Sequence, residues 1–319
     1  MRGEGRARAI TVRDMRRRTG FAILAACALA AGTATAAGGR APSLPGARAC
    51  PIFPASNVWN RTVSDLPVAA NSAAMISAIG LDAPVHPDFG SFLGYGIPYN
   101  VVSGKKVHKV HVSFDYADES DKVAYPMPAH PRQEGGGDGH VLIVDKASCR
   151  LYELYAAHES GGTWKAGSGA VWNLRSNHLR PDTWTSADAA GLPILAGLVR
   201  YDEVASGAIR HALRFTASRT TKAHIYPARH DAGDSDRSLP PMGLRVRLKA
   251  SVNISGFPKQ ARVVLQALKT YGMILADNGS PWYISGASNK HFNDDDLHAL
   301  GKITGADFEV VDTSHLRSG

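Results

Sequence analysis

The sequence predicts a mainly β protein, a single β-sandwich or jelly-roll-like domain with a few short peripheral helices, for which an α+β arrangement is the alternative. Short apolar or alternating segments fill the middle of the chain and are separated by turns rich in Gly, Asp and Ser, whereas few segments have helical periodicity. The 319 residues are 44% hydrophobic and 20% charged, which is typical of a globular chain, and no internal repeat is found.

The N-terminus has the charge and hydropathy order of a secretory signal peptide. Seven arginines precede the apolar run at 21–31, and Ala34-Thr35-Ala36 follows it. This apolar run is too short to span a bilayer. We therefore predict a signal peptide over residues 1–36 and a secreted mature chain with no transmembrane span.

After this signal we predict a flexible leader over residues 37–49, which is rich in Gly, Pro and Ala, and a single globular domain over residues 50–319. The segment Leu24-Ala25-Ala26-Cys27 also fits a lipoprotein processing box. Attachment of lipid at Cys27 is the alternative, and the protein would then be tethered to the cell surface.

The formal charge of +8 belongs mostly to the targeting segment. Residues 1–36 hold seven arginines and two acidic residues, so the remainder carries 29 basic and 26 acidic residues, a net charge of +3. The sequence Arg245-Val-Arg247-Leu-Lys249 is interpreted as the outward face of a strand. We therefore expect no nucleic-acid partner.

Two cysteines, Cys50 and Cys149, remain after export. An even pair in an oxidising compartment predicts a disulfide with Cα atoms within about 7 Å, against the alternative of two buried free thiols. There is no CxxC, HExxH, GxGxxG or GxxxxGK[ST] pattern, so we expect no metal and no cofactor.

In the first half, Asn71–Gly80 has a cap, apolar spacing and a terminal glycine that predict a short helix. Strand patterns follow between Asn100 and Pro126, and Val141–Val144 and Cys149–Tyr155 form a predicted hairpin. In the second half we predict further strands at 164–172, 212–216, 223–227, 244–248 and 308–311.

Two segments near the C-terminus have clear signals. Pro258 at the start, a stripe of apolar residues and Gly272 at the end predict a helix from Pro258 to Tyr271. Met273–Ala276 and Trp282–Ile284 are predicted as two strands joined by a tight Asn-Gly turn. A short helix is expected at Asp294–Leu300.

The segment from Arg175 to Glu203 is long, irregular and rich in chemistry-bearing side chains. Ordering such a segment costs conformational entropy that other interactions must offset. A long irregular segment inside a globular chain is therefore typical of a binding or catalytic loop. The glycine-rich turn 133–140 precedes the strand at Val141, and its glycines allow positive φ. We expect Asp188 of the loop to face Glu134 or His140 of this turn across the main cleft.

Several blocks resemble a group of secreted bacterial proteins of unassigned function. They are HVLIVDKASCRLYELYAA, WTSADAAGLPILAGLVRYDEV, GAIRHALRFT, PPMGLRVRLKA and LKTYGMILADNG. The resemblance covers most of the chain after the leader and implies a single domain, but it carries no catalytic residues onto these positions.

These features favour a secreted enzyme acting on a polysaccharide or cell-envelope glycan, a carboxylate-dependent glycoside hydrolase. The predicted catalytic residues are Glu134, Asp188, Glu203 and His140. The predicted substrate-binding residues are Trp172, Arg175, Asn177, Arg180, Trp184 and His211, and Trp282 is a further candidate sugar platform. The Trp and His candidates could instead have a purely structural role, because these residues in β proteins often belong to the core.

Two alternatives stay open. A noncatalytic carbohydrate-binding or envelope-associated protein would also be exported and β-rich. A polysaccharide lyase would use His140 or His211 for proton abstraction from a uronate. Ser186 lacks a GxSxG elbow, which disfavours a serine hydrolase.

Overall fold

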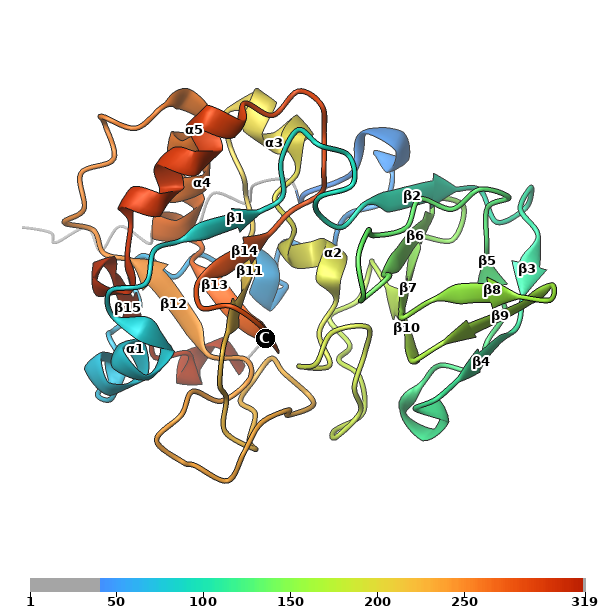
Figure 1. Cartoon of the computed structure of the whole chain (residues 1–319), viewed down its shortest axis with the longest axis horizontal. Helices are drawn as coiled ribbons and strands as arrows, with labels where there is room; N and C mark the ends of the chain where they lie inside the picture. Colours follow the sequence, from blue (N-terminus) through green and yellow to red (C-terminus); the bar gives the residue numbers. More distant parts are fainter. Residues whose placement is uncertain (1–40, 318–319) are drawn as a thin grey trace, which may run out of the picture. The chain divides into compact units, whose positions relative to one another are not determined.

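The computed structural model describes residues 41–317, so the predicted signal peptide and Cys27 lie outside the described part. The described residues fall within one compact unit. The mainly β prediction is confirmed, because the strands form several sheets and the helices are few and mostly short (Figure 1). No helix between residues 41 and 317 is long and apolar enough to cross a bilayer.

The largest sheet has six strands in the order β1-β14-β11-β13-β12-β15. The pairs β1/β14 and β11/β13 are parallel, and the other pairs are antiparallel. Helix α4 packs near β12, and α1 packs near β15. The strands are β1 (His86–Asp88), β11 (Leu213–Ala217), β12 (Arg245–Leu248), β13 (Met273–Asn278), β14 (Tyr283–Ser285) and β15 (Phe308–Val310).

A second sheet has four strands in the order β10-β7-β6-β2, and two small sheets, β3-β5 and β4-β9-β8, lie beyond it (Figure 1). Its strands are β2 (Tyr99–Val102), β6 (Val141–Asp145), β7 (Arg150–Tyr155) and β10 (Ser168–Asn173). The small sheets contain β3 (Lys109–Val110), β4 (Val112–Phe114), β5 (Tyr125–Pro126), β8 (His158–Ser160) and β9 (Thr163–Ala166).

The α-helices are α1 (Ser72–Gly80), α2 (Ile194–Gly197), α3 (Tyr201–Ser206), α4 (Lys259–Thr270) and α5 (Asp294–His298). Short 3-10 helices occur at Pro45–Ala47, Val58–Asn60, Ala117–Glu119, Ala299–Lys302, Gly305–Asp307 and Ser314–Arg317. The predicted helices at 71–80, 258–271 and 294–300 therefore all form, with small differences at their ends.

The predicted hairpin in the first half is β6/β7, which closes at the pair Asp145 and Arg150. Every residue of β6 is buried. Leu142 and Val144 belong to the main core, whereas Val141 and Ile143 belong to a second apolar cluster. Because successive strand residues point to opposite faces, the four-stranded sheet is covered on both sides.

The predicted disulfide joins Cys50 to Cys149, with 5.2 Å between the Cα atoms. It links the N-terminal segment to the turn that precedes β7. The core extends further toward the N-terminus than the predicted start of the domain at Cys50, because Leu44 and Ala47 are also buried.

Helix α4 presents a stripe of buried residues that includes Val264, Leu265 and Leu268. Leu265→Ala is expected to lower the free energy of unfolding by about 2–5 kcal/mol, because Leu265 is fully buried and truncation leaves a cavity. Chemical denaturation measures this loss. The exposed neighbour Gln266 provides the control, since Gln266→Ala should change stability little. Equal stability of the two variants would show that Leu265 is not packed in the core.

The predicted hairpin between Met273 and Ile284 is wrong. Strand β11 lies between β13 and β14, pairing Leu213 with Met273 on one side and Phe215 with Ile284 on the other. Asn278 is the last residue of β13, and neither it nor Gly279 adopts positive φ; the chain turns at Pro281-Trp282, where Trp282 has φ of +60°. Local turn chemistry cannot reveal such a non-local insertion.

The prediction that Arg245 faces outward from its strand is also wrong. Arg245 is 1% exposed and donates hydrogen bonds to the backbone carbonyls of Val58, Arg61 and Tyr271 at 2.6–3.0 Å. Burial lowers the pKa of Arg245 to about 9. Arg247 pairs with Glu309 at 2.8 Å. These arginines therefore fasten β12 to its surroundings and form no basic face.

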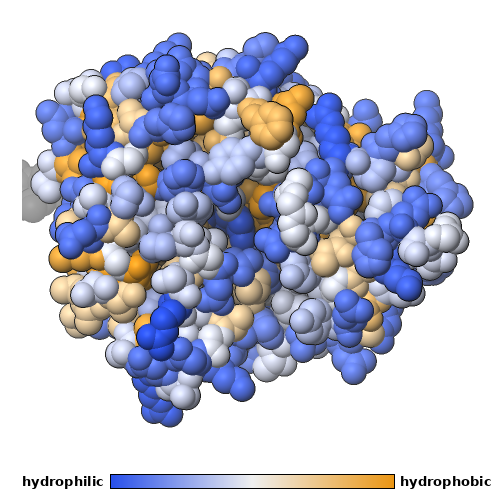
Figure 2. Space-filling model, viewed as in Figure 1, coloured by the Kyte–Doolittle hydropathy of each residue, from blue (hydrophilic) through white to orange (hydrophobic). Residues whose placement is uncertain are grey.

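On the face shown in Figure 2, polar side chains cover most of the surface and apolar side chains form small separate patches. Two large apolar side chains that are strongly exposed, Phe92 and Leu93, lie in the segment between β1 and β2. This face therefore presents no extended apolar docking surface.

Candidate active site

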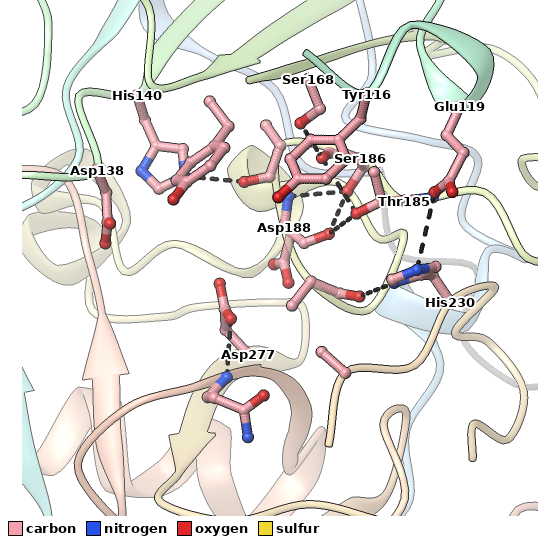
Figure 3. A pocket seen from close by; sticks show the side chains of 15 residues that line it. Tyr116, Glu119, Asp138, His140, Ser168, Thr185, Ser186, Asp188, His230 and Asp277 are labelled. Atoms are coloured by element: carbon pink, nitrogen blue, oxygen red, sulfur yellow. Dashed lines mark hydrogen bonds and ion pairs between the residues drawn. The ribbon is translucent and has the colours of Figure 1, made fainter. Parts of the chain in front are cut away.

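A pocket of about 340 Å³ opens where the two larger sheets come together (Figure 3). Asp277 and Asn278 reach it from the end of β13, Tyr155 from the end of β7 and Ser168 from the start of β10. The loop at 185–189 forms a further wall. The remaining lining residues are Tyr116, Glu119, Asp138, His140, His230 and Ala232.

Arg214 of β11 binds two carboxylates beside this pocket. Its Nη2 lies 3.0 Å from Oδ2 of Asp188 and 3.6 Å from Oδ2 of Asp277, and its Nε donates to Asp188 at 3.1 Å. Nη1 donates to the hydroxyl of Ser285 at 2.6 Å. In Figure 3 the carboxyl groups of Asp188 and Asp277 point toward one another. One buried guanidinium thus holds an acidic pair.

The two acids differ in their access to the pocket. The side chain of Asp188 is 0% exposed, and its Oδ1 also accepts from the amide of Ala190. The side chain of Asp277 is 29% exposed. Burial raises the pKa of Asp188 to about 7, against the opposing charge of Arg214. Burial also raises the pKa of Asp277, so the accessible acid of the pair retains its proton to higher pH than a free Asp.

The glycine-rich turn contributes a third carboxylate to the pocket. Gly136 and Gly139 adopt φ of +90° and +52°, which confirms the predicted positive φ. This path brings the exposed side chain of Asp138 to the pocket, where its charge adds to the rise in the pKa of Asp277. Asp138 and Asp277 therefore present two carboxyl groups to the same space.

His140 of this turn is fixed at both ring nitrogens. Nδ1 faces Oε2 of Glu134, and Nε2 lies 2.8 Å from the carbonyl oxygen of Ala187. A carbonyl accepts only, so Nε2 carries hydrogen. Burial lowers the pKa of His140, but the hydrogen bond and charge of Glu134 outweigh that effect and raise it. His140 thus positions the backbone next to Asp188 and has no free nitrogen to act as a base.

The predicted meeting of the turn and the loop is therefore found. His140 and Asp188 line the same pocket, and His140 bonds to the residue before Asp188. Glu134 reaches the site through His140.

Arg180 fastens the loop instead of facing the pocket. It is 6% exposed, and its guanidinium pairs with Asp121 at 2.5 Å and donates to the carbonyls of Glu119 and Thr185 at 2.7 Å each. It also lies over the rings of Trp172 and Trp184, about 5.5 Å from their centroids. This network holds the segment that leads into 185–189.

Four predicted site residues lie away from this pocket. Arg175 approaches the carbonyl of Ala49, and Asn177 bonds to Ser56 and Asn57. Glu203 pairs with Arg200 and His211. His211, 1% exposed, uses both ring nitrogens, on Glu203 and on its neighbour's carbonyl. The pocket therefore does not bring Glu203 together with Asp188.

Two of the proposed sugar platforms belong to the core. Trp172 is 5% exposed, and Trp282 is fully buried. Trp282 stacks between Phe215 and Phe308, with centroids 5.4 and 5.1 Å away, and donates Nε1–H to the carbonyl of Gly80. Trp184 is half-buried against Arg180. Large apolar rings gain more from core packing than from exposure, which explains this placement.

One fully buried acid, Glu153, was not a predicted site residue. Glu153 of β7 accepts hydrogen bonds from the amides of Ile194 and Leu195, at 2.9 and 2.8 Å, at the start of α2. Burial raises the pKa of Glu153 to about 7, although both amides oppose the rise. This residue couples the second sheet to the loop.

Glu153→Gln is expected to remove a pH-dependent part of the stability. The folded-state pKa of about 7 exceeds the ordinary value of 4.5, so the folded protein keeps a proton that the unfolded chain releases between these limits. The free energy of unfolding therefore falls as pH rises through this window, by up to about 1.4 kcal/mol per pH unit from this group. Denaturation across pH should show a shallower slope for Glu153→Gln and an unchanged slope for the exposed control Glu159→Gln. Identical slopes for Glu153→Gln and wild type would contradict the raised pKa.

Sequence reasoning missed Asp277 and Arg214. From the sequence, Asp277 falls in the predicted tight turn and Arg214 in the predicted strand 212–216, and neither was selected as a site residue. A signal was present, because an arginine inside a buried strand needs an anionic partner. Tyr116 and Tyr155, which line the same pocket, carried no comparable signal.

Comparisons with protein-family models, with curated proteins and with solved structures find no match to this chain. The resemblance to secreted bacterial proteins stays a prediction. A functional assignment therefore depends on the geometry of the pocket.

Proposed function

We propose that the protein is a secreted glycan-active hydrolase whose active site is the pocket between β7 and β13. The observation that carries the proposal is the accessible carboxyl group of Asp277, whose pKa is raised by burial and which shares its pocket with the exposed carboxylate of Asp138. Glycoside hydrolysis uses two carboxyl groups beside the scissile bond, one as the proton donor and the other as nucleophile, base or charge stabiliser.

Asp277 is the proposed general acid. As the bond between the anomeric carbon and the glycosidic oxygen breaks, Asp277 gives its proton to the departing oxygen. Water then adds to the anomeric carbon, and the proton that this water loses restores the acid form of Asp277. Asp138 is the proposed second carboxylate and stabilises the positive charge that develops on the sugar ring. Asp188 and Arg214 position Asp277 without touching substrate.

The pocket also has walls suited to a sugar. Tyr116 is 57% exposed and Tyr155 is half-buried, and both line the pocket. An aromatic ring offers an apolar face and a hydroxyl, which suits the mixed character of a sugar. These tyrosines take the platform role that the sequence assigned to tryptophans.

A lyase is less well supported by the geometry. Elimination requires a base with a free acceptor atom near the substrate. His140 and His211, the candidate bases, both have their two ring nitrogens engaged. The disulfide suits an oxidising compartment, in keeping with secretion.

The test is to incubate the purified mature protein with neutral and acidic polysaccharides. New reducing ends without absorbance from unsaturated uronates would support hydrolysis. Absorbance from unsaturated products would establish elimination and overturn the proposal. Binding without any product across the panel would favour the noncatalytic alternative.

A further inference from the structure

A second pocket, of about 610 Å³, lies near the start of the four-stranded sheet. Tyr99 of β2 and the segment at 132–133 form one wall, and the segment at 287–291 forms another. Arg200 and the first residues of α3 complete it. Gln133 lines this pocket, and its chain neighbour Glu134 binds His140 of the first pocket, so one short segment serves both.

Positive charge predominates in this second pocket. Arg132 and Lys290 are exposed, and neither forms an ion pair within residues 41–317. His291 lies beside Tyr201, with ring centroids 5.4 Å apart. Asp202 is the acidic residue of the lining, so the side chains of this pocket carry more positive than negative charge.

The most buried cation that lines the pocket is Arg200. Arg200 is 1% exposed, and its Nη2 pairs with Glu203 at 2.7 Å. Its Nη1 donates to the carbonyls of Leu195 and Leu198, whereas its Nε has no hydrogen-bond partner in the described part of the chain. A buried donor without an acceptor costs free energy, and a bound anion nearby would offset that cost electrostatically.

Arg132 is also held in place. Its amide donates to Oδ1 of Asn100 at 2.8 Å, and its carbonyl accepts from Nδ2 of the same residue at 2.9 Å. Asn100 is itself buried in β2. The backbone of Arg132 is therefore anchored to the sheet beside this pocket.

We propose that the second pocket binds an anionic group, a carboxylate or a phosphate, carried by the glycan on which the first pocket acts. The part of this inference that names a glycan rests on the proposed function, whereas binding of the anion does not. Arg132 and Lys290 supply the charge, and Tyr99 and Tyr201 border the space. The protein is accordingly specific for acidic glycans.

Calorimetric titration of the mature protein tests this, with Asp277→Asn as background to prevent turnover. The probes are trigalacturonate, its neutral counterpart galactotriose, and a glycerol-phosphate trimer. We expect an anionic probe to bind, the neutral probe to bind at least about ten-fold more weakly, and Arg132→Gln/Lys290→Gln to weaken anion binding about ten-fold or more. Preference between the two anionic probes identifies the source of the charge.

The matched control is Lys105→Gln/Lys302→Gln, which removes the same charge from exposed positions outside the pocket. Unchanged anion binding in Arg132→Gln/Lys290→Gln, equal loss in the control, or no binding of either anion would overturn the inference. Hydrolysis of a neutral glycan with no anion binding would leave the proposed function standing and reject this site. Anion binding without hydrolysis of any glycan would support this anion site and reject the proposed function.

Discussion

An Asp277→Asn variant is expected to fold normally and to lose turnover by about 10²–10⁴-fold, the usual contribution of a general acid. The amide keeps the shape of the carboxyl group and can still accept from the amide of Asn278, which lies 2.8 Å from Oδ1. It has no acidic proton for the leaving oxygen. Steady-state kinetics on the glycan identified by the polysaccharide panel measures the loss in kcat.

The matched control for Asp277→Asn is Asp118→Asn, which alters a carboxylate that is fully exposed and lies outside the pocket. This control should keep wild-type kcat. A folded Asp277→Asn protein with wild-type kcat would reject Asp277 as the acid. Asp188→Asn should act differently, by lowering stability, because Asp188 is the closest carboxylate to Arg214.

Arg214→Met is expected to lower the free energy of unfolding by about 3–5 kcal/mol, because it leaves Asp188 buried and without its cation. Thermal and chemical denaturation measure this loss. The loss should be largest above pH 7, where Asp188 would otherwise ionise, and smaller at low pH, where the acid is neutral.

Arg237→Met is the control for this substitution, since Arg237 is exposed and should tolerate the change. If Arg214→Met does not fold, the double variant Arg214→Met/Asp188→Asn, which removes both charges, should recover folded protein. Wild-type stability of the single variant at neutral pH would show that the ion cluster does not hold the site.

Features set by local pattern could be predicted from the sequence. Helix α4 follows from a 3.6-residue apolar period, hairpin β6/β7 from two apolar runs and a turn, and the disulfide from a count of cysteines. The approach of Asp188 to His140 was also predictable, because both lie in irregular, polar segments flanking strands.

Features set by strand order could not be predicted in this way. Asp277 becomes a site residue because β13 lies beside β11, where Arg214 points to the same space. That parallel pairing spans about 60 residues of chain and leaves no local periodic signal. Trp282 and Arg245 were misplaced for a related reason, since an aromatic ring or a guanidinium is buried or exposed according to the partners that the fold supplies.

The most direct test of Asp277 as the general acid is a crystal structure of Asp277→Asn with an oligosaccharide fragment of its substrate. We expect a sugar ring in the pocket beside Tyr116 and Tyr155, with the glycosidic oxygen within about 2.6–3.2 Å of the side chain at position 277 and Asp138 near the anomeric carbon. An oligosaccharide bound elsewhere, or one whose glycosidic oxygen lies beyond reach of position 277, would contradict this role of Asp277.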